Sequence, residues 1–81
     1  MRNLTVKYFG ILADIVQKHE EQFLLDVEDN SLKSLQLMLE TRYPEIKNIT
    51  YSIAVNQCIV NTGAKLKPND ELALLPPFSG G

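Results

Sequence analysis

The chain has 81 residues, of which 44% are hydrophobic and 22% charged, and its formal net charge is −2. This length and composition are typical of one small soluble domain with a thin core, and the negative charge argues against nucleic acid as a partner, because duplex-binding proteins carry a basic stripe. One cysteine and one histidine are too few for a disulfide or a zinc site, and no apolar run is long enough to span a bilayer, so we expect a reduced cytoplasmic domain that binds neither metal nor membrane.

Two strands and a short helix are predicted in the first third of the chain. Residues 3–9 alternate and carry apolar side chains on both faces, which favours a central strand. After Gly10, residues 11–18 change to helical spacing and predict about two turns. The polar residues 18–21 predict a connection, and residues 22–27 predict a second strand.

The main helix is predicted from Ser31 to about Arg42. Ser31 is a good N-cap, and Pro44 disfavours the helical conformation of the residue before it. The helix carries one apolar stripe, which we interpret as core, formed by Leu32, Leu35 and Leu39.

The second half of the chain predicts an irregular segment and then three short strands. A tight turn is expected at Asn56-Gln57, because Asn tolerates positive φ, and another turn before the last strand. The predicted strands are residues 52–55, 58–60 and 71–75. The fold class is therefore α+β, with a mixed sheet of about four to five strands packed on one main helix. Residues 1–75 form the domain and residues 76–81 an extended tail.

The tail reads Pro76-Pro77-Phe78-Ser79-Gly80-Gly81. The two prolines end the strand and favour a stiff exit, and glycines let enclosing walls approach the backbone closely. The terminal carboxylate is ionised at neutral pH and can attack the α-phosphate of ATP on a partner enzyme. The mixed anhydride then accepts a sulfur or nitrogen nucleophile. A frayed terminus is the competing interpretation.

The sequence resembles the MoaD family, the small sulfur carrier subunits of molybdopterin synthase, which have a ubiquitin-like β-grasp fold. The resemblance covers the whole chain. It rests on Val6-Lys7-Tyr8-Phe9, on Arg42-Tyr43-Pro44, on Ile53-Ala54-Val55-Asn56 and, most specifically, on the ending from Asn69-Asp70-Glu71 to Gly80-Gly81.

The resemblance implies a carrier that is not catalytic alone and that donates sulfur within the synthase. An E1-like enzyme would adenylate Gly81 with ATP, and a sulfur donor protein would convert the adenylate to a thiocarboxylate. The tail would then enter the large catalytic subunit, in a heterotetramer, and pass sulfur to cyclic pyranopterin monophosphate. No cofactor would bind the carrier itself. The tail and partner-binding residues would be Leu75, Pro76, Pro77, Phe78, Ser79 and Gly80.

Three alternatives remain. A ThiS-type carrier of thiamine biosynthesis uses the same terminal chemistry but is typically shorter and lacks the two prolines. A β-grasp interaction module would need no Gly81. A self-contained enzyme would have only His19 and Cys58 as base and nucleophile, whereas we expect His19 to be a solvated surface residue and Cys58 to be buried and inert. We interpret Glu20-Glu21 and Glu28-Asp29 as loop charges, and expect apolar residues on the sheet face away from the helix, such as Leu75, to contact a partner.

Overall fold

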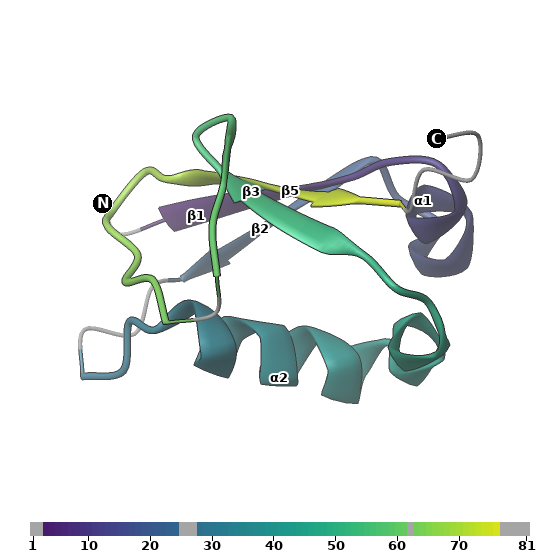
Figure 1. The fold of residues 1–81 in the computed structure, drawn as a ribbon, viewed down its shortest axis with the longest axis horizontal. Helices are drawn as coiled ribbons and strands as arrows, with labels where there is room; N and C mark the ends of the chain where they lie inside the picture. The colour runs from purple at the N-terminus through teal and green to yellow at the C-terminus, as the bar shows by residue number, and fades with distance from the viewer. Residues whose placement is uncertain (1–2, 25–27, 62, 77–81) are drawn as a thin grey trace.

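The computed structural model describes residues 3–24, 28–61 and 63–76. The described residues form two α-helices, one 3-10 helix and a five-stranded sheet, consistent with the predicted fold class (Figure 1). In chain order the elements are β1 (Asn3–Tyr8), α1 (Ile11–Val16), β2 (Glu20–Leu24), α2 (Leu32–Arg42), η1 (Pro44–Asn48), β3 (Ser52–Val55), β4 (Cys58–Ile59) and β5 (Glu71–Leu75).

The strands are arranged in the order β2-β1-β5-β3-β4. The ladder between β1 and β5 is parallel and the other three are antiparallel, so the sheet is mixed. The two strands predicted to be central, β1 and β5, are both inner strands and pair with each other. Strand β5 carries apolar side chains on both faces. Strand β1 buries its apolar face on the helix side and has a polar opposite face, on which the first apolar residue is Phe9, just after the strand.

The second strand begins earlier than the sequence pattern predicted. The polar residues Glu20 and Glu21 belong to β2 and pair with Lys7 and Val6 of β1, so the prediction of a connection there was wrong. The physical reason is that the backbones of these two residues form ladder hydrogen bonds with β1, and such bonds do not depend on how polar the side chains are. Residues 25–27, which we had placed in the same strand, lie outside the described residues.

Helix α2 begins and ends where its capping residues require. The hydroxyl of Ser31 accepts a hydrogen bond from the backbone N–H of Ser34 at 3.2 Å, as expected of an N-cap. Asp29 in turn accepts a hydrogen bond from the Ser31 hydroxyl at 2.9 Å. At the other end Tyr43 leaves the helical region with φ −127°, one residue before Pro44.

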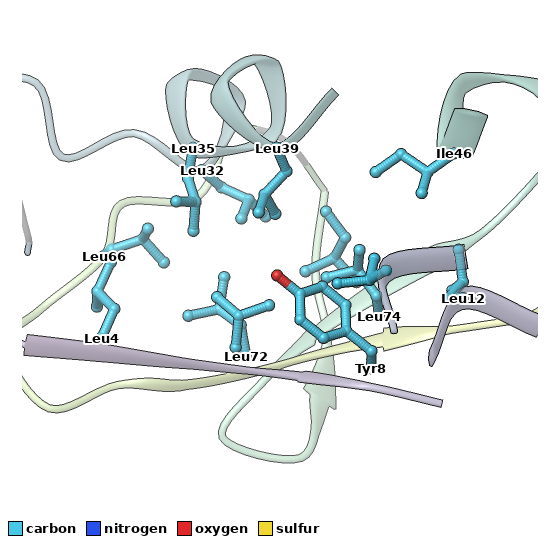
Figure 2. Packing of buried hydrophobic residues seen from close by; sticks show 13 residues of the cluster. Leu4, Tyr8, Leu12, Leu32, Leu35, Leu39, Ile46, Leu66, Leu72 and Leu74 are labelled. Atoms are coloured by element: carbon cyan, nitrogen blue, oxygen red, sulfur yellow. The ribbon is translucent and has the colours of Figure 1, made fainter. Parts of the chain in front are cut away.

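The hydrophobic core lies between α2 and one face of the sheet (Figures 1 and 2). Leu32, Leu35 and Leu39 point from α2 toward the sheet, as the stripe predicted. The strands and loops contribute a larger buried set, namely Leu4, Val6, Tyr8, Ile53, Leu66, Leu72 and Leu74. Leu12 and Val16 of α1 and Ile46 of η1 complete the core at the end where these two helices meet.

The turns follow the predicted turn chemistry. Asn56 and Gln57 both have positive φ, 50° and 72°, which is the two-residue turn that matches the twist of a hairpin. Asn69 has φ 70° before β5, so asparagine serves where positive φ is required. No helix in residues 3–24, 28–61 and 63–76 is long and apolar enough to cross a membrane.

Candidate functional site

The candidate site begins where β5 ends. Strand β5 is held on both sides, by β1 and by β3, so its last residue Leu75 has a rigid support. Leu75 and Pro76 are both partly buried. The other predicted tail residues, Pro77, Phe78, Ser79, Gly80 and Gly81, lie outside the described residues.

Pro76 packs against the corner between β1 and α1. That corner turns at Gly10, which has φ +59°, a conformation that side chains disfavour. A Cβ atom on Gly10 would lie 2.9 Å from Cγ of Pro76, which is closer than Cβ atoms come to other heavy atoms in proteins. The missing side chain of Gly10 therefore makes room for the first proline of the tail. Sequence reasoning used Gly10 only as a break between elements, and nothing local to it indicated this contact.

An apolar groove lies on the sheet face away from α2, next to the start of the tail. It has a volume of about 460 Å³, and we call it the outer groove. Its residues come from β1, β3, β4, β5 and the adjoining turns: Lys7, Phe9, Ala54, Gln57, Ile59, Glu71, Ala73 and Leu75. Ala54 and Ala73 are register partners, so two small side chains form its floor. Phe9 and Ile59 are 44% and 70% exposed although both are large and apolar.

Exposed apolar side chains around a hollow are typical of protein interaction sites. The prediction that Leu75 lies on such a face therefore agrees with the structure, which also identifies its neighbours. The sequence signal that could have found them is the alternation of β5, where Ala73 and Leu75 point away from the core side chains Leu72 and Leu74.

A group of polar side chains surrounds Glu21 on the helix side of the sheet, and we call it the Glu21 cluster. The carboxylate of Glu21 accepts hydrogen bonds from Tyr8 Oη at 3.0 Å, Tyr43 Oη at 2.8 Å, Lys18 Nζ at 3.0 Å and Arg42 Nη1 at 2.9 Å. Burial of Tyr8, together with its hydrogen bond to Glu21, raises the tyrosine pKa well above its usual range. The interpretation of Glu21 as a loop charge was wrong, because partners from α2 and from other segments distant in sequence surround it.

The Glu21 cluster is a structural network rather than a reactive site. Both oxygens of the carboxylate are occupied by donors, and the side chain is only 13% exposed. In a similar but smaller contact, the hydroxyl of Tyr51 donates a hydrogen bond to Glu40 at 2.7 Å. Burial of Tyr51, together with this hydrogen bond, raises its pKa to about 12. In both clusters the carboxylate is held by tyrosine hydroxyl groups.

His19 and Cys58 cannot act as a base and nucleophile pair. His19 directly precedes β2 and Cys58 lies in β4, which are the two edge strands of the sheet. Four strand spacings separate these edges, which is about 19 Å. His19 is exposed, as expected, but Cys58 is exposed too, so the expectation of a buried thiol was wrong. A two-residue edge strand gives its side chains little cover. Among the described residues, no three His, Cys, Asp or Glu side chains gather closely enough to hold a metal ion.

Comparison with known proteins places the chain in one family. Residues 6–81 match the sequence profile of the ThiS family. The molybdopterin synthase sulfur carrier subunit of Homo sapiens is 37% identical, over 94% of this chain and 91% of the human protein.

Two solved structures extend the comparison. Small archaeal modifier protein 1 of Haloferax volcanii superposes with a TM-score of 0.82 and 22% identity, over 98% of this chain and 99% of that one, which shows a shared fold. A chain in the complex of subunits 1 and 2 of the molybdopterin-converting factor of Helicobacter pylori gives a TM-score of 0.71 and 27% identity, over 98% of this chain and 99% of that one.

Proposed function

The chain belongs to the ThiS/MoaD family, and from that premise we propose that it is the sulfur carrier subunit of a molybdopterin synthase. One observation carries the proposal: 37% identity over nearly the whole length to a human protein with that name. The family profile alone supports a thiamine or a molybdopterin carrier equally. The human relative and the Helicobacter pylori complex both favour molybdopterin.

In this proposal the chemistry belongs to the carboxylate of Gly81. One of its oxygens attacks the α-phosphorus of ATP on an E1-like enzyme, and pyrophosphate leaves. Sulfide supplied by a donor protein then attacks the carbonyl carbon, and AMP leaves with the oxygen that had attacked phosphorus, so that this oxygen of the carboxylate is replaced by sulfur. The resulting thiocarboxylate passes its sulfur to cyclic pyranopterin monophosphate. ATP is a substrate of the partner, and the carrier binds no cofactor of its own.

The fold supports this division of work. Strand β5 has a hydrogen-bonded neighbour on each side and leads directly into Pro76, which packs on Gly10. A tail that begins on such a support leaves the domain from a fixed point. Of the remaining tail residues, Gly80 is proposed to thread a channel of the partner, because a glycine lets the enclosing walls approach the backbone closely. Pro76, Pro77 and Phe78 are proposed to form the segment that docks on the partner, with Ser79 between that segment and the glycines.

The partner that receives the tail is the large catalytic subunit, in a heterotetramer of two carriers and two large subunits. A tail of six residues cannot bury the roughly 800 Å² per partner that a stable complex needs. The outer groove supplies apolar surface beside the start of the tail, because Leu75 belongs to both. We therefore propose that the large subunit covers the outer groove, and that the complex forms in the cytoplasm.

The proposal is tested by intact mass spectrometry of the carrier. The protein is incubated with ATP, an E1-like activating enzyme and a sulfur source, and we expect one oxygen of the Gly81 carboxyl group to be replaced by sulfur. The loaded carrier is then mixed with the large subunit and the pterin precursor, and molybdopterin is expected to form. A thiazole product with the thiamine enzymes instead would assign the alternative pathway. If a known carrier is loaded and this chain is not, the proposal is wrong.

A further inference from the structure

An ion pair lies within the otherwise apolar outer groove. Nζ of Lys7 on β1 lies 3.1 Å from a carboxylate oxygen of Glu71 on β5, and the two side chains are 37% and 44% exposed. The other groove residues except Gln57 are apolar. Exposed ion pairs contribute little to folding, about 0–1 kcal/mol. The stability of the fold therefore does not explain why charges occupy this face.

The ion pair lies toward the end of the groove that is farther from the tail. Glu71 begins β5, whereas Lys7 is the register partner of Ala73, midway between Glu71 and Leu75, and its ammonium group reaches the Glu71 carboxylate. Leu75 lies four residue steps after Glu71, which is about 13 Å along the strand. A partner that holds the tail and covers the groove therefore contacts apolar side chains near the tail and the two charges farther from it.

We propose that the Lys7–Glu71 ion pair determines the orientation and the specificity of docking, by matching a pair of opposite charges on the tail-receiving subunit. The inference rests on the proposed function and adds this recognition site to it. The tail alone fixes one point of the complex and leaves the partner free to rotate about that point. A second, polar contact at the far end of the groove removes this freedom.

The order of the charges carries the specificity. Lys7 is on β1 and Glu71 on β5, so the groove presents a positive and then a negative charge across neighbouring strands. A subunit that places a negative charge against Lys7 and a positive charge against Glu71 is attracted. A subunit with the two charges exchanged places like charges against each other in an interface from which water is excluded. A subunit with only apolar residues there would remove water from both charges without compensation.

The test compares charge-altered carriers for binding to the large subunit from the same organism. The variant Lys7→Glu/Glu71→Lys reverses the order of the charges and keeps the net charge. Position 7 also faces Glu20 across the β1–β2 ladder, so the thermal unfolding midpoint of this variant is measured alongside binding. The variant Lys7→Met/Glu71→Gln keeps the side-chain length without charge and avoids that repulsion. The control is Glu45→Lys/Lys47→Glu, a reversal of two exposed charges on η1.

We expect the reversed pair to raise Kd by at least about tenfold and the neutral pair by less, while the control stays within about twofold of the wild type. Because the contact is electrostatic, the difference between wild type and reversed pair should shrink as ionic strength increases. Unchanged binding of the neutral pair would overturn the inference, as would equal weakening in the control. A wild-type carrier that is never loaded with sulfur would instead refute the proposed function. That outcome is read from the mass spectrum and is independent of these affinities.

Discussion

At the scale of single residues, Glu21 has the environment with the largest consequence. Burial favours its neutral form, but the hydrogen bonds that it accepts from Lys18, Tyr43 and Tyr8 outweigh burial and lower its pKa. The charged form is therefore the one that the folded protein stabilises. Four donors from three separate segments converge on this carboxylate, so it links β1, β2 and the end of α2.

The linkage between pKa and stability gives a signed prediction for Glu21. A carboxyl group with a lowered folded pKa adds stability that is complete above its unfolded pKa, about 4.3, and is lost as pH falls through the folded value. We expect Glu21→Gln to lower the free energy of unfolding by about 1–3 kcal/mol at pH 7. Below the folded pKa the difference from wild type should become smaller.

Urea unfolding at pH 7 and at acidic pH measures the effect of Glu21→Gln. Glu45→Gln is the matched control, because Glu45 is exposed on η1 and should leave the unfolding free energy unchanged at both pH values. An equal loss of stability at neutral and acidic pH for Glu21→Gln would contradict the electrostatic explanation.

At the scale of elements, the side chain of Asn56, in the turn between β3 and β4, is hydrogen-bonded to the turn that precedes β5. Asn56 donates from Nδ2 to Oδ1 of Asp70 at 2.8 Å and accepts from the backbone N–H of Glu71 at 3.0 Å. Asp70 is 8% exposed, and its other oxygen accepts from the backbone N–H of Lys67 at 2.8 Å. The turn residue therefore also completes the turn that precedes β5.

Replacing Asn56 separates these two roles. Asn56→Gly keeps the positive φ but loses both hydrogen bonds, and we expect about 1–2 kcal/mol less unfolding free energy. Asn56→Ala adds the strain of a left-handed residue and should lose about 1 kcal/mol more. Gln57→Gly, at the next position of the same turn, loses no such hydrogen bond and should stay within about 1 kcal/mol of wild type. Urea unfolding of the three variants checks this order, and Asn56→Ala with wild-type stability would contradict it.

Local sequence patterns predicted the elements whose causes are local. The apolar stripe of α2, the cap at Ser31, the turn at Asn56 and the two-sided pattern of β5 all appear as expected. The errors occur where distant residues decide the outcome. Glu21 joins a strand because its partners come from elsewhere in the chain, and Cys58 is exposed because β4 is a short edge strand.

The candidate site divides in the same way. Its chemistry was predicted from the tail motif, which extends from Pro76 to Gly81, but residues beyond Pro76 lie outside the described ones. The contact between Pro76 and Gly10 and the outer groove depend on the order of strands in the sheet. β1 and β5 become neighbours only when the chain has folded, so a linear pattern does not show what lies beside the tail.

At the scale of the whole molecule, the domain and its tail have separate tasks. Among the residues that the structure describes, the buried core lies entirely before Leu75, and the five strands of the sheet end at Leu75. Stability and sulfur transfer should therefore respond to different substitutions. This separation distinguishes a carrier from an enzyme whose reactive groups belong to its core, and from an interaction module that needs no terminal glycine.

Changes at the last two positions test that separation directly. Adding one alanine after Gly81 moves the carboxylate away from the activated position, and Gly80→Val adds a branched side chain where the proposed channel requires none. Both variants should keep the wild-type unfolding midpoint, because terminal residues make few core contacts. Both should lose molybdopterin formation in the reconstituted reaction, and the extended variant should also lose the mass shift of sulfur loading. An alanine added before Met1 serves as the control for added length. If the extended carrier still supported molybdopterin formation, the reactive group would not be the Gly81 carboxylate, and the groove would then belong to an interaction module.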